Sequence, residues 1–459
     1  GDIDLIETDP RFAGYRQWLS SDYMLSQLAY DPATTQKRLG DGFYEQRLLT
    51  EQIAQLTGRR FLEGYASDEA QYRALMEAGV TVAGELQLIP GVALSEAQIA
   101  QLTSDIVWLV EKEVALADGS TQKALVPQVY VRIREGDLAP TGGLLAGENV
   151  AIDLTGDLHN QGTIAGRRVV ALTAENIKNL GGRISGETIA LNARQDLTIR
   201  GGTIDAGDVL QALAGRQLTI ESTTRDTENS EGDAHFTRTN IDRIAALYVN
   251  NPGGTLTLAA GTDLALNAAQ LQSAGSTVID AGGNLRLGTV RIAEENDTGA
   301  DAANKNRSGA TAEIGTTIEG TGSILLSAAN DLSARAASIT STTGALAAVA
   351  GHDLLIEAGE ASEHSEITQK KKRSGTFSSK TKIQRDAFAD TRAQASTFSG
   401  DTVTLQAGNN LRVLGSNVVS TNETALTAGR NLAIESATEK HTETHYKKTK
   451  QSGVFGSGG

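Results

Sequence analysis

The sequence predicts a mainly β protein, most of which is a parallel β-helix (a β-solenoid) with turns of about 20 residues. The main observation is a repeated phrase: glycine, one further residue, an Asn or Asp, and an alternating apolar run such as Leu-x-Leu. Copies of this phrase begin at Gly261, Gly282, Gly351, Gly408 and Gly429, and two neighbouring pairs are 21 residues apart. Composition agrees, since 49 glycines, 6 prolines and only 4% aromatic residues favour a thin stacked coil over a large globular core.

The repeat length and its alternation decide between repeat architectures. About 20 residues is too short for a helix–turn–helix unit, and apolar alternation with period two is typical of strands. One unit cannot bury its own apolar face, so successive units must stack with parallel strands about 4.8 Å apart. We expect corner glycines to supply positive φ angles, and the Asn or Asp side chains to form a polar ladder. Parallel crossovers are nearly always right-handed, so the sequence predicts a right-handed coil of about ten turns.

Charge and composition exclude some classes of function. A formal net charge of −15 disfavours non-specific nucleic-acid binding. No apolar run approaches the roughly 18 residues of a transmembrane helix. The chain has no cysteine, which suits a protein that is exported unfolded. It shows neither a signal peptide nor an initiator Met, so we expect an internal piece of a longer chain.

Residues 1–140 predict a small α-rich domain. Five of the six prolines and both tryptophans lie there, and the apolar spacing is helical. We expect one helix between Asp9-Pro10 and Asp31-Pro32, a second from Tyr44 to Gly58, and a third from Ser67 to Gly79.

The end of this domain predicts one more helix and a strand. Ser95 and Gln98 form a capping box. An apolar stripe follows it, made of Ile99, Leu102, Ile106, Leu109 and Val110. Alternation from Val126 to Ile133 predicts a strand that leads out of the domain. The tryptophans and four tyrosines have helical spacing and are expected in the core, with an interface patch as the alternative: Trp18, Trp108, Tyr15, Tyr23, Tyr30 and Tyr44.

Residues 141–459 are the predicted β-helix. Its repeat is interrupted four times by polar excursions, near 222–250, 293–313, 358–398 and 436–459. Each excursion begins directly after a strand of the Leu-x-Leu type, at the same place in the unit. We therefore expect loops or hairpins that project from one edge of the coil, the side on which repeat proteins often bind partners.

One dense basic run stands out in the third excursion. Our candidate contact residues for a membrane or a partner are Lys370, Lys371, Lys372, Arg373, Lys380 and Lys382. Such a cluster could contact lipid head groups, lipopolysaccharide or an acidic protein. The alternative is a charged hairpin that simply stays solvated, because Glu363, Glu366 and Asp386 lie in the same excursion.

Metal and catalytic sites are not predicted. His441, Glu443 and His445 would share one face of a strand, and an exposed polar face is favoured over a metal site. Four aspartates are assigned to corner capping rather than to polysaccharide cleavage: Asp153, Asp196, Asp263 and Asp353. The sequence contains no nucleophile elbow, phosphate-binding loop or calcium nonapeptide, so we predict neither an enzyme nor a cofactor.

Several stretches resemble one family of very large bacterial exoproteins. They are Gly42–Leu48, Gln55–Phe61, Asp105–Val110, the repeated phrase itself, and the Ser452–Gly458 tail. The similarity is to the filamentous-haemagglutinin and contact-dependent-inhibition family, whose members are exported by two-partner secretion. The resemblance implies an outer-membrane two-partner secretion transporter as a partner of the full-length chain. It also implies a monomer that is exported through the periplasm and outer membrane to the bacterial surface.

The resemblance favours one function, and two alternatives stay open. It implies a non-enzymatic filament segment that supports delivery of a C-terminal toxin, in contact with the outer membrane or a receptor of the target cell. The first alternative is a host-cell or cell–cell adhesin whose excursions bind a glycan or receptor. The second is a polysaccharide-active β-helix enzyme, which would need carboxylates clustered in a groove.

Overall fold

The computed structural model describes residues 20–30, 42–57, 67–115, 120–132, 144–301, 303–376 and 378–453. The chain divides into two compact units, residues 1–141 and 142–459. Most of the first expected helix, with Tyr15 and Trp18, lies outside the described residues, as do residues 454–459 and the side chain of Tyr44. Within the described part, no helix has both the length and the apolar character needed to cross a membrane.

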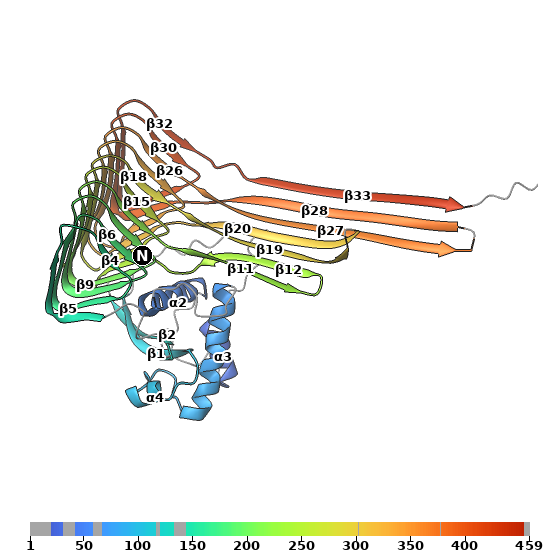
Figure 1. Ribbon diagram of the computed structural model, residues 1–459, viewed down its shortest axis with the longest axis horizontal. Helices are drawn as coiled ribbons and strands as arrows, with labels where there is room; N and C mark the ends of the chain where they lie inside the picture. Colours follow the sequence, from blue (N-terminus) through green and yellow to red (C-terminus); the bar gives the residue numbers. More distant parts are fainter. Residues whose placement is uncertain are drawn as a thin grey trace, which may run out of the picture. The chain divides into compact units, whose positions relative to one another are not determined.

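The first unit contains four described helices and one hairpin (Figure 1). They are α1 (Ser21–Gln27), α2 (Gly42–Thr57), α3 (Asp68–Leu86), α4 (Glu96–Ala100), β1 (Ile106–Ala115) and β2 (Thr121–Tyr130). The predicted start of α3 is confirmed, because the Ser67 side chain accepts from the backbone N–H of Ala70 at 3.1 Å. The capping box of Ser95 and Gln98 is also confirmed, with both of its hydrogen bonds present.

Two helix boundaries predicted for this unit were wrong. The stripe behind the capping box is not one helix, because α4 ends at Ala100 and Ile106–Val110 lie in β1, paired antiparallel with β2. Helix α3 does not end at Gly79 but continues to Leu86. A Cβ at Gly79 would lie 2.1 Å from the carbonyl oxygen of Val107, so this glycine allows α3 to approach β1 closely.

The core of the first unit holds Trp108 and Tyr72, both fully buried. The core assignment is therefore right for Trp108, and Tyr23 packs against the same cluster. It is wrong for Tyr30, which is 46% exposed just beyond α1.

One buried carboxylate ties three helices of this unit together. Glu45 of α2 accepts from the backbone N–H and the hydroxyl of Ser21 at 2.7 and 2.6 Å, and from the hydroxyl of Tyr72 at 2.5 Å. Burial raises the pKa of Glu45, although these three hydrogen bonds act against that rise. Its donors come from α1 and α3, so Glu45 links all three helices.

The second unit is a stack of parallel turns. One strand of each turn joins a ten-stranded sheet: β4 (Leu158–Asn160), β6 (Ile177–Leu180), β8 (Leu197–Arg200), β10 (Leu218–Glu221), β15 (Leu264–Asn267), β18 (Leu285–Gly288), β23 (Leu332–Arg335), β26 (Leu354–Glu357), β30 (Leu411–Leu414) and β32 (Leu432–Glu435). All of its neighbouring strands are parallel. The parallel stacking of the Leu-x-Leu strands is therefore confirmed.

The other sides of each turn belong to one fourteen-stranded sheet. Its strands are β3 (Leu144–Asp153), β5 (Thr163–Ala174), β7 (Arg183–Ala193), β9 (Thr203–Ala214), β13 (Ala246–Val249), β14 (Thr255–Ala260), β16 (Gln270–Ser273), β17 (Ser276–Ala281), β21 (Thr317–Gly320), β22 (Ile324–Ala328), β24 (Ser338–Ser341), β25 (Ala345–Ala350), β29 (Thr397–Ala407) and β31 (Asn417–Ala428). Inward Leu, Ile, Val and Ala side chains from both sheets form one continuous apolar core. Burial of this core drives the stacking.

The predicted polar ladder is confirmed. In each step, a side-chain oxygen accepts the backbone N–H of the equivalent residue one turn later, as from Asp331 to Asp353 at 3.0 Å and from Asp353 to Asn410 at 3.1 Å. The residues whose side chains accept in this way are Asp157, Asn176, Asp196, Asp263, Asn284, Asp331 and Asp353. Each bond satisfies a backbone donor that no strand ladder would satisfy.

The prediction that the glycines of the repeated phrase adopt positive φ angles was wrong. The structure places the positive φ angles at the other corner, after strands of the ten-stranded sheet, at Gly181, Gly201 and Gly415. The phrase glycines instead allow close stacking. A Cβ at Gly351 would lie 2.0 Å from the carbonyl oxygen of Ala329, and a Cβ at Gly408 would lie 2.0 Å from that of Gly351.

Seven further strands form a separate antiparallel sheet, here called the hairpin sheet (Figure 1). In spatial order they are β11 (Thr224–Glu231), β12 (Ala234–Ile241), β19 (Val290–Asp301), β20 (Asn304–Ile314), β27 (Gly359–Gly375), β28 (Ser378–Gln394) and β33 (Lys440–Gly453). The four excursions of the sequence fall on these strands. They are not independent loops, because the three hairpins pair with one another in order and the last of them pairs with the single strand β33.

The hairpins leave every second turn. Strands β11, β19, β27 and β33 follow β10, β18, β26 and β32, whereas β15, β23 and β30 lead directly into the next strand of their turn. A two-stranded hairpin occupies about 10 Å across the strands, and two stacked turns rise by about the same distance. Alternate turns therefore space the hairpins so that they join edge to edge into one sheet.

Buried hydroxyls support the bases of the hairpins. Ser396, which follows β28, donates to the carbonyl oxygen of Glu357 at 2.7 Å and accepts from the backbone N–H of Ala337 at 2.9 Å. Thr316, which follows β20, donates to the carbonyl oxygen of Leu266 at 2.8 Å. Both side chains are fully buried, so these bonds satisfy polar groups that water does not reach.

Candidate functional site

The six candidate cations lie on β27 and β28, in the part of the hairpin sheet farthest from the stacked turns along the chain. Their pairing brings like charges together, because Lys371 is directly opposite Lys382, and Arg373 is directly opposite Lys380. Lys370 and Lys372 point to the other side of the sheet, since neighbouring residues of a strand alternate between faces. The basic run is therefore divided between two faces.

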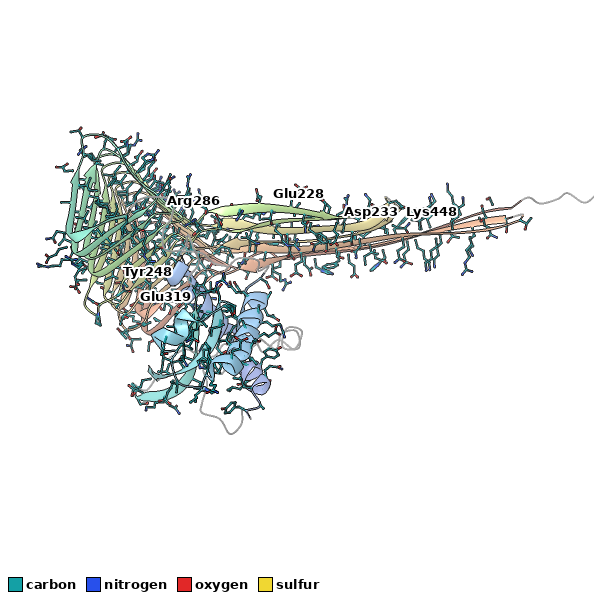
Figure 2. The ribbon with its side chains drawn as sticks, turned by 60° about the horizontal axis from the view of Figure 1, so that its bottom comes forward. Glu228, Asp233, Tyr248, Arg286, Glu319 and Lys448 are labelled. Carbon is teal, nitrogen blue, oxygen red and sulfur yellow. The ribbon has the colours of Figure 1, made fainter. Side chains whose placement is uncertain are left out.

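Strand β33 adds cations that sequence reasoning did not include. Lys447 is opposite Gln384, Lys448 is opposite Ile383, and Lys450 is opposite Thr381. Figure 2 shows Lys448 on the outer part of the hairpin sheet, away from the stacked turns. The only sequence signal was a second basic run, Lys447-Lys448-x-Lys450, whose pairing with β28 could not be read from the chain.

The cations can be grouped by face. The Lys382 face carries Lys371, Arg373, Lys380, Lys382 and Lys447, and the Lys370 face carries Lys370, Lys372, Lys448 and Lys450. Together these nine residues are here called the cationic end of the hairpin sheet. All are exposed except Lys382, which is half-buried.

Repulsion among these cations affects the pKa of one member. The positive charge of Lys447 lowers the pKa of Lys382, and partial burial, Lys371 and Lys380 lower it further. Among the described residues, none of the nine cations has an ion-pair partner within 4.0 Å. Nearer the turns the sheet is different, since Arg385 pairs with Glu366 at 2.7 Å and Arg392 with Glu363 at 3.2 Å.

A shallow groove borders the cationic end. It has a volume of about 500 Å³ and crosses β19, β20 and β27. It is lined by Thr298, Asn304, Lys305, Asn306, Ile367, Thr368, Gln369 and Lys371. Apart from Lys305 and Lys371 the lining is uncharged, and Ile367 is its one apolar residue, so the groove extends the cationic surface without neutralising it.

His441, Glu443 and His445 do share one face of β33, but they are joined to carboxylates. His441 Nδ1 contacts Asp390, and His445 Nδ1 lies 2.8 Å from Asp386 Oδ1, both across the pairing with β28. Glu443 Oε1 lies 2.9 Å from His445 Nε2. Hydrogen bonds to these carboxylates raise the pKa of both imidazoles. The cluster therefore acts as a charged clasp between two strands.

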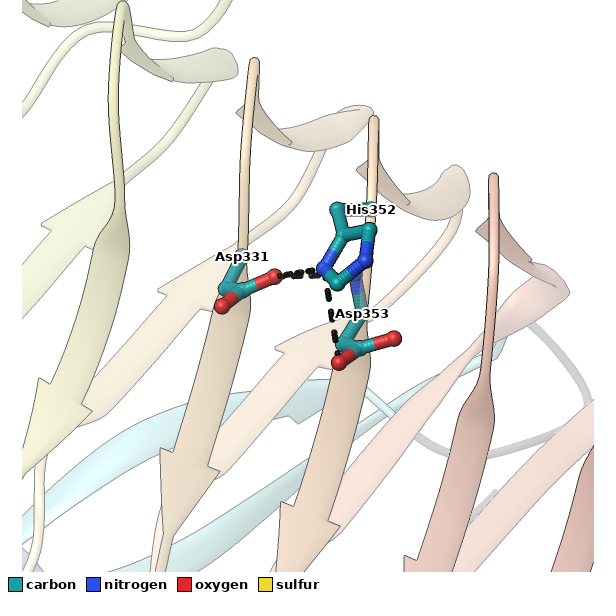
Figure 3. A group of neighbouring side chains, drawn as sticks. All are labelled: Asp331, His352 and Asp353. Carbon is teal, nitrogen blue, oxygen red and sulfur yellow. Dashed lines mark hydrogen bonds and ion pairs between the residues drawn. The ribbon is translucent and has the colours of Figure 1, made fainter.

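A second His–carboxylate group lies on the stacked turns (Figure 3). His352 Nδ1 is 2.9 Å from Asp331 Oδ1 and 3.4 Å from Asp353 Oδ2. Two carboxylates and an imidazole are chemically able to hold a divalent ion. However, one oxygen of each aspartate already accepts a backbone N–H in the polar ladder, and all three side chains are at least 40% exposed. Sequence reasoning identified Asp353 as a corner cap but did not identify His352.

For the other three aspartates predicted as corner caps, the structure confirms two and contradicts one. Asp196 and Asp263 belong to the polar ladder, as predicted for corner capping. Asp153 was placed wrongly, because it is the exposed last residue of β3 and not a corner residue. The three confirmed caps, Asp196, Asp263 and Asp353, lie in one column along the stack.

Comparison with known proteins agrees with this architecture. A family model described as Hemagglutinin repeat matches residues 173–236 and 297–454, which include much of the hairpin sheet. No solved structure matches the chain.

The chain is similar to several curated proteins, some of which match nearly its whole length. It is 30% identical over 458 residues to "tRNA nuclease CdiA-2" of Burkholderia pseudomallei, covering 98% of this chain and 14% of that protein. It is 31% identical over 297 residues to "Toxin CdiA" of Yersinia pestis, covering 63% and 9%. It is 28% identical over 526 residues to "16S rRNA endonuclease CdiA" of Enterobacter cloacae, covering 99% and 15%.

The chain spans only about one seventh of the length of the relatives that match it throughout. The activities in the names of those proteins belong to much longer polypeptides. The sequence similarity to them covers nearly the whole chain and so includes both of its units. On these grounds the chain is a CdiA-like member of the filamentous-haemagglutinin family.

Proposed function

We propose that this chain is a non-enzymatic segment of a large secreted exoprotein of contact-dependent growth inhibition, and that it supports delivery of a C-terminal toxin. One observation carries the proposal. The parallel turns are stacked in register from β4 (Leu158–Asn160) to β32 (Leu432–Glu435), and seven antiparallel strands pair into one sheet, which gives a long scaffold with a single projecting sheet.

In this proposal the stacked turns form a right-handed β-helix. Residues 1–140 are an α-rich domain, and residues 141–459 are the β-helix with its excursions. The handedness follows the general preference of parallel crossovers. The exoprotein would pass an outer-membrane two-partner secretion transporter, act at the bacterial surface as a monomer, and meet the target-cell envelope. The matches to CdiA proteins support these assignments.

The absence of an enzyme role is proposed from the positions of the acidic groups. Among the described residues, the ladder aspartates lie in one column along the stack, and each has an oxygen that accepts a backbone N–H group. This holds also for Asp331 and Asp353, the two that lie close together around His352. A polysaccharide-cleaving site would instead need two carboxylates that are free to act on one substrate bond. This favours a scaffold over the polysaccharide-active alternative.

The test is a deletion in the full-length exoprotein that contains this chain. Removing residues 144–453 should leave surface display and attachment to target cells intact, and should abolish toxin entry. A matched control removes only Leu285–Asp353, two complete turns with one hairpin, and should retain entry. Toxin entry that survives the large deletion would refute the delivery role, and loss of attachment would favour the adhesin alternative.

A further inference from the structure

The nine residues of the cationic end form a surface that the scaffold itself does not require. We propose that this end of the hairpin sheet binds the phosphate groups of an anionic lipid headgroup layer. This inference adds a binding partner to the proposed function. It rests on that function in one respect, because it assumes that the sheet is exposed outside the producing cell. Three observations support it.

The first observation is uncompensated repulsion. Like charges directly opposite each other weaken strand pairing, yet Lys371 faces Lys382 and Arg373 faces Lys380. Within the residues described here, no carboxylate forms an ion pair within 4.0 Å with any of the nine cations, although the charge of Lys370 helps to lower the pKa of Asp301. The same sheet pairs its charges elsewhere, for example Arg307 with Asp297 at 3.0 Å. An external anion would relieve this repulsion.

The second observation is a charge gradient across the sheet. The hairpin β11–β12 has two Lys or Arg against four Asp or Glu, whereas β27–β28 has eight against five and β33 has four against one. The whole chain carries a net charge of −15, so the last three strands oppose its overall sign. Figure 2 shows the two ends of this gradient, with Glu228 and Asp233 on the first hairpin and Lys448 on β33.

The third observation decides what kind of anion fits. On the Lys382 face the cations lie on three adjacent strands, about 4.8 Å apart across the sheet, and on the Lys370 face they lie on β27 and β33 with the uncharged Thr381 and Ile383 of β28 between them. Along a strand, neighbouring cations of one face are about 7 Å apart. A single polyanionic chain would follow one face and leave the other unpaired. A layer of phosphate groups that the end of the sheet enters can surround both faces at once. The geometry therefore favours a lipid headgroup layer.

The experiment measures binding of the purified chain to vesicles. Vesicles of phosphatidylglycerol and phosphatidylcholine should float the chain at 50 mM salt, and vesicles of phosphatidylcholine alone should not. Binding should weaken steeply at 300 mM salt, because the contact is electrostatic. Each contact between a lysine and an anionic membrane changes the affinity about fivefold. Reversing four cations should therefore lower affinity at least about 100-fold.

The test variant carries K371E, K382E, K448E and K450E, two changes on each face. Its matched control carries K178E, R183E, R286E and R430E, four exposed cations of the stacked turns, with the same change in net charge. The control should bind within about threefold of the original chain. Circular dichroism and unchanged amide exchange in the stacked turns establish that both variants fold.

Three results would overturn the proposal: equal binding to uncharged vesicles, retained binding in the test variant, or an equal loss in the control. A fourth would be binding of inorganic polyphosphate chains without binding of vesicles, which would assign the surface to a soluble polyanion. None of these results bears on the deletion experiment, because toxin entry is measured in the full-length exoprotein. The two proposals can therefore fail separately.

Discussion

Arg335 of β23 donates to both carboxylate oxygens of Glu313, the penultimate residue of β20, at 2.7 and 2.8 Å. Glu313 also accepts from the backbone N–H of Glu360, at the start of β27. Arg335 lies on a turn that has no hairpin, between the two turns that release β19–β20 and β27–β28. One ion pair therefore connects the bases of two consecutive hairpins through the turn between them.

This arrangement predicts that Glu313→Gln loosens the second and third hairpins. Burial raises the pKa of Glu313, but hydrogen bonds from Arg335, Glu360 and Thr289 outweigh it, so the pKa is lowered overall. Removing one partner of this largely buried pair should cost about 2 kcal/mol. Amide exchange of β20 and β27 should accelerate accordingly. The surface pair Arg194–Glu175 is the control, and Glu175→Gln should cost less than about 0.5 kcal/mol.

The same pair predicts an acid-sensitive hairpin base. A lowered carboxyl pKa contributes stability above its unfolded value of 4.5, and this contribution is lost as the pH falls through the folded pKa. Exchange in β20 and β27 of the original chain should therefore increase below pH 4, and the Glu313→Gln variant should show a smaller change. An equal pH response in both proteins would contradict the role of Glu313.

The spacing of hairpins predicts an unusual outcome for deletions. Removing Leu285–Asp353 takes out two turns and one hairpin, and leaves the remaining hairpins on alternate turns. Removing only Leu332–Asp353 takes out a single turn and puts two hairpins on adjacent turns. Each hairpin needs about 10 Å and adjacent turns provide about 4.8 Å. The smaller deletion should therefore be the more destabilising one.

Thermal unfolding and amide exchange of β27 and β28 measure this difference. Both deletions preserve the register of the polar ladder, because each joins a ladder residue to the first leucine of a later turn. Register at the junction is thus the same in the two variants. If the single-turn deletion were as stable as the two-turn deletion, the hairpin sheet would not depend on alternate turns.

Part of this architecture could be predicted because it is local. The alternation at Leu264-x-Leu266 fixes which side chains point inward, and the Asp or Asn before each strand marks the ladder. The pairing of β28 with β33 could not be predicted, since about 50 residues separate Asp390 from its partner His441. Six of the nine residues of the cationic end were therefore predicted, and Lys447, Lys448 and Lys450 were missed.

Other errors came from patterns with two physical readings. The spacing of Ile99, Leu102, Ile106 and Leu109 fits a helix, but Ile106–Val110 is also a continuous apolar run rich in β-branched residues. Antiparallel pairing with β2 settles the choice in favour of a strand. A glycine such as Gly351 can signal either a positive φ angle or a close contact, and only the structure separates the two.

Gly351 itself provides a direct test of close stacking. In Gly351→Ala the new methyl group would meet the carbonyl oxygen of Ala329 at 2.0 Å, so adjacent turns must separate. We expect a loss of about 1–3 kcal/mol in the free energy of unfolding. Gly156→Ala is the control, since no atom lies within 4 Å of the position that its methyl group would take, and its φ is not positive. It should change stability by less than about 0.5 kcal/mol.

The clasp between β28 and β33 predicts a dependence on mildly acidic pH. Asp390 and Glu443 raise the pKa of His441, and Asp386 and Glu443 raise that of His445. A raised imidazole pKa contributes stability that is complete below the unfolded value of 6.5 and is lost as the pH rises through the folded pKa. The pairing should therefore be tighter at pH 5.5 than at pH 8.

Other charges on this face do not reverse that expectation. Glu363 and Arg392 pair with each other at 3.2 Å, and Lys447 lies beyond His445 toward the cationic end. Hydrogen–deuterium exchange of β33, corrected for the intrinsic effect of pH, measures the difference. In the His441→Gln, His445→Gln double variant the protection of β33 should no longer change between the two pH values. A pH effect that persists in this variant would place the responsible titration elsewhere, because the double variant removes both imidazoles that bridge the two strands.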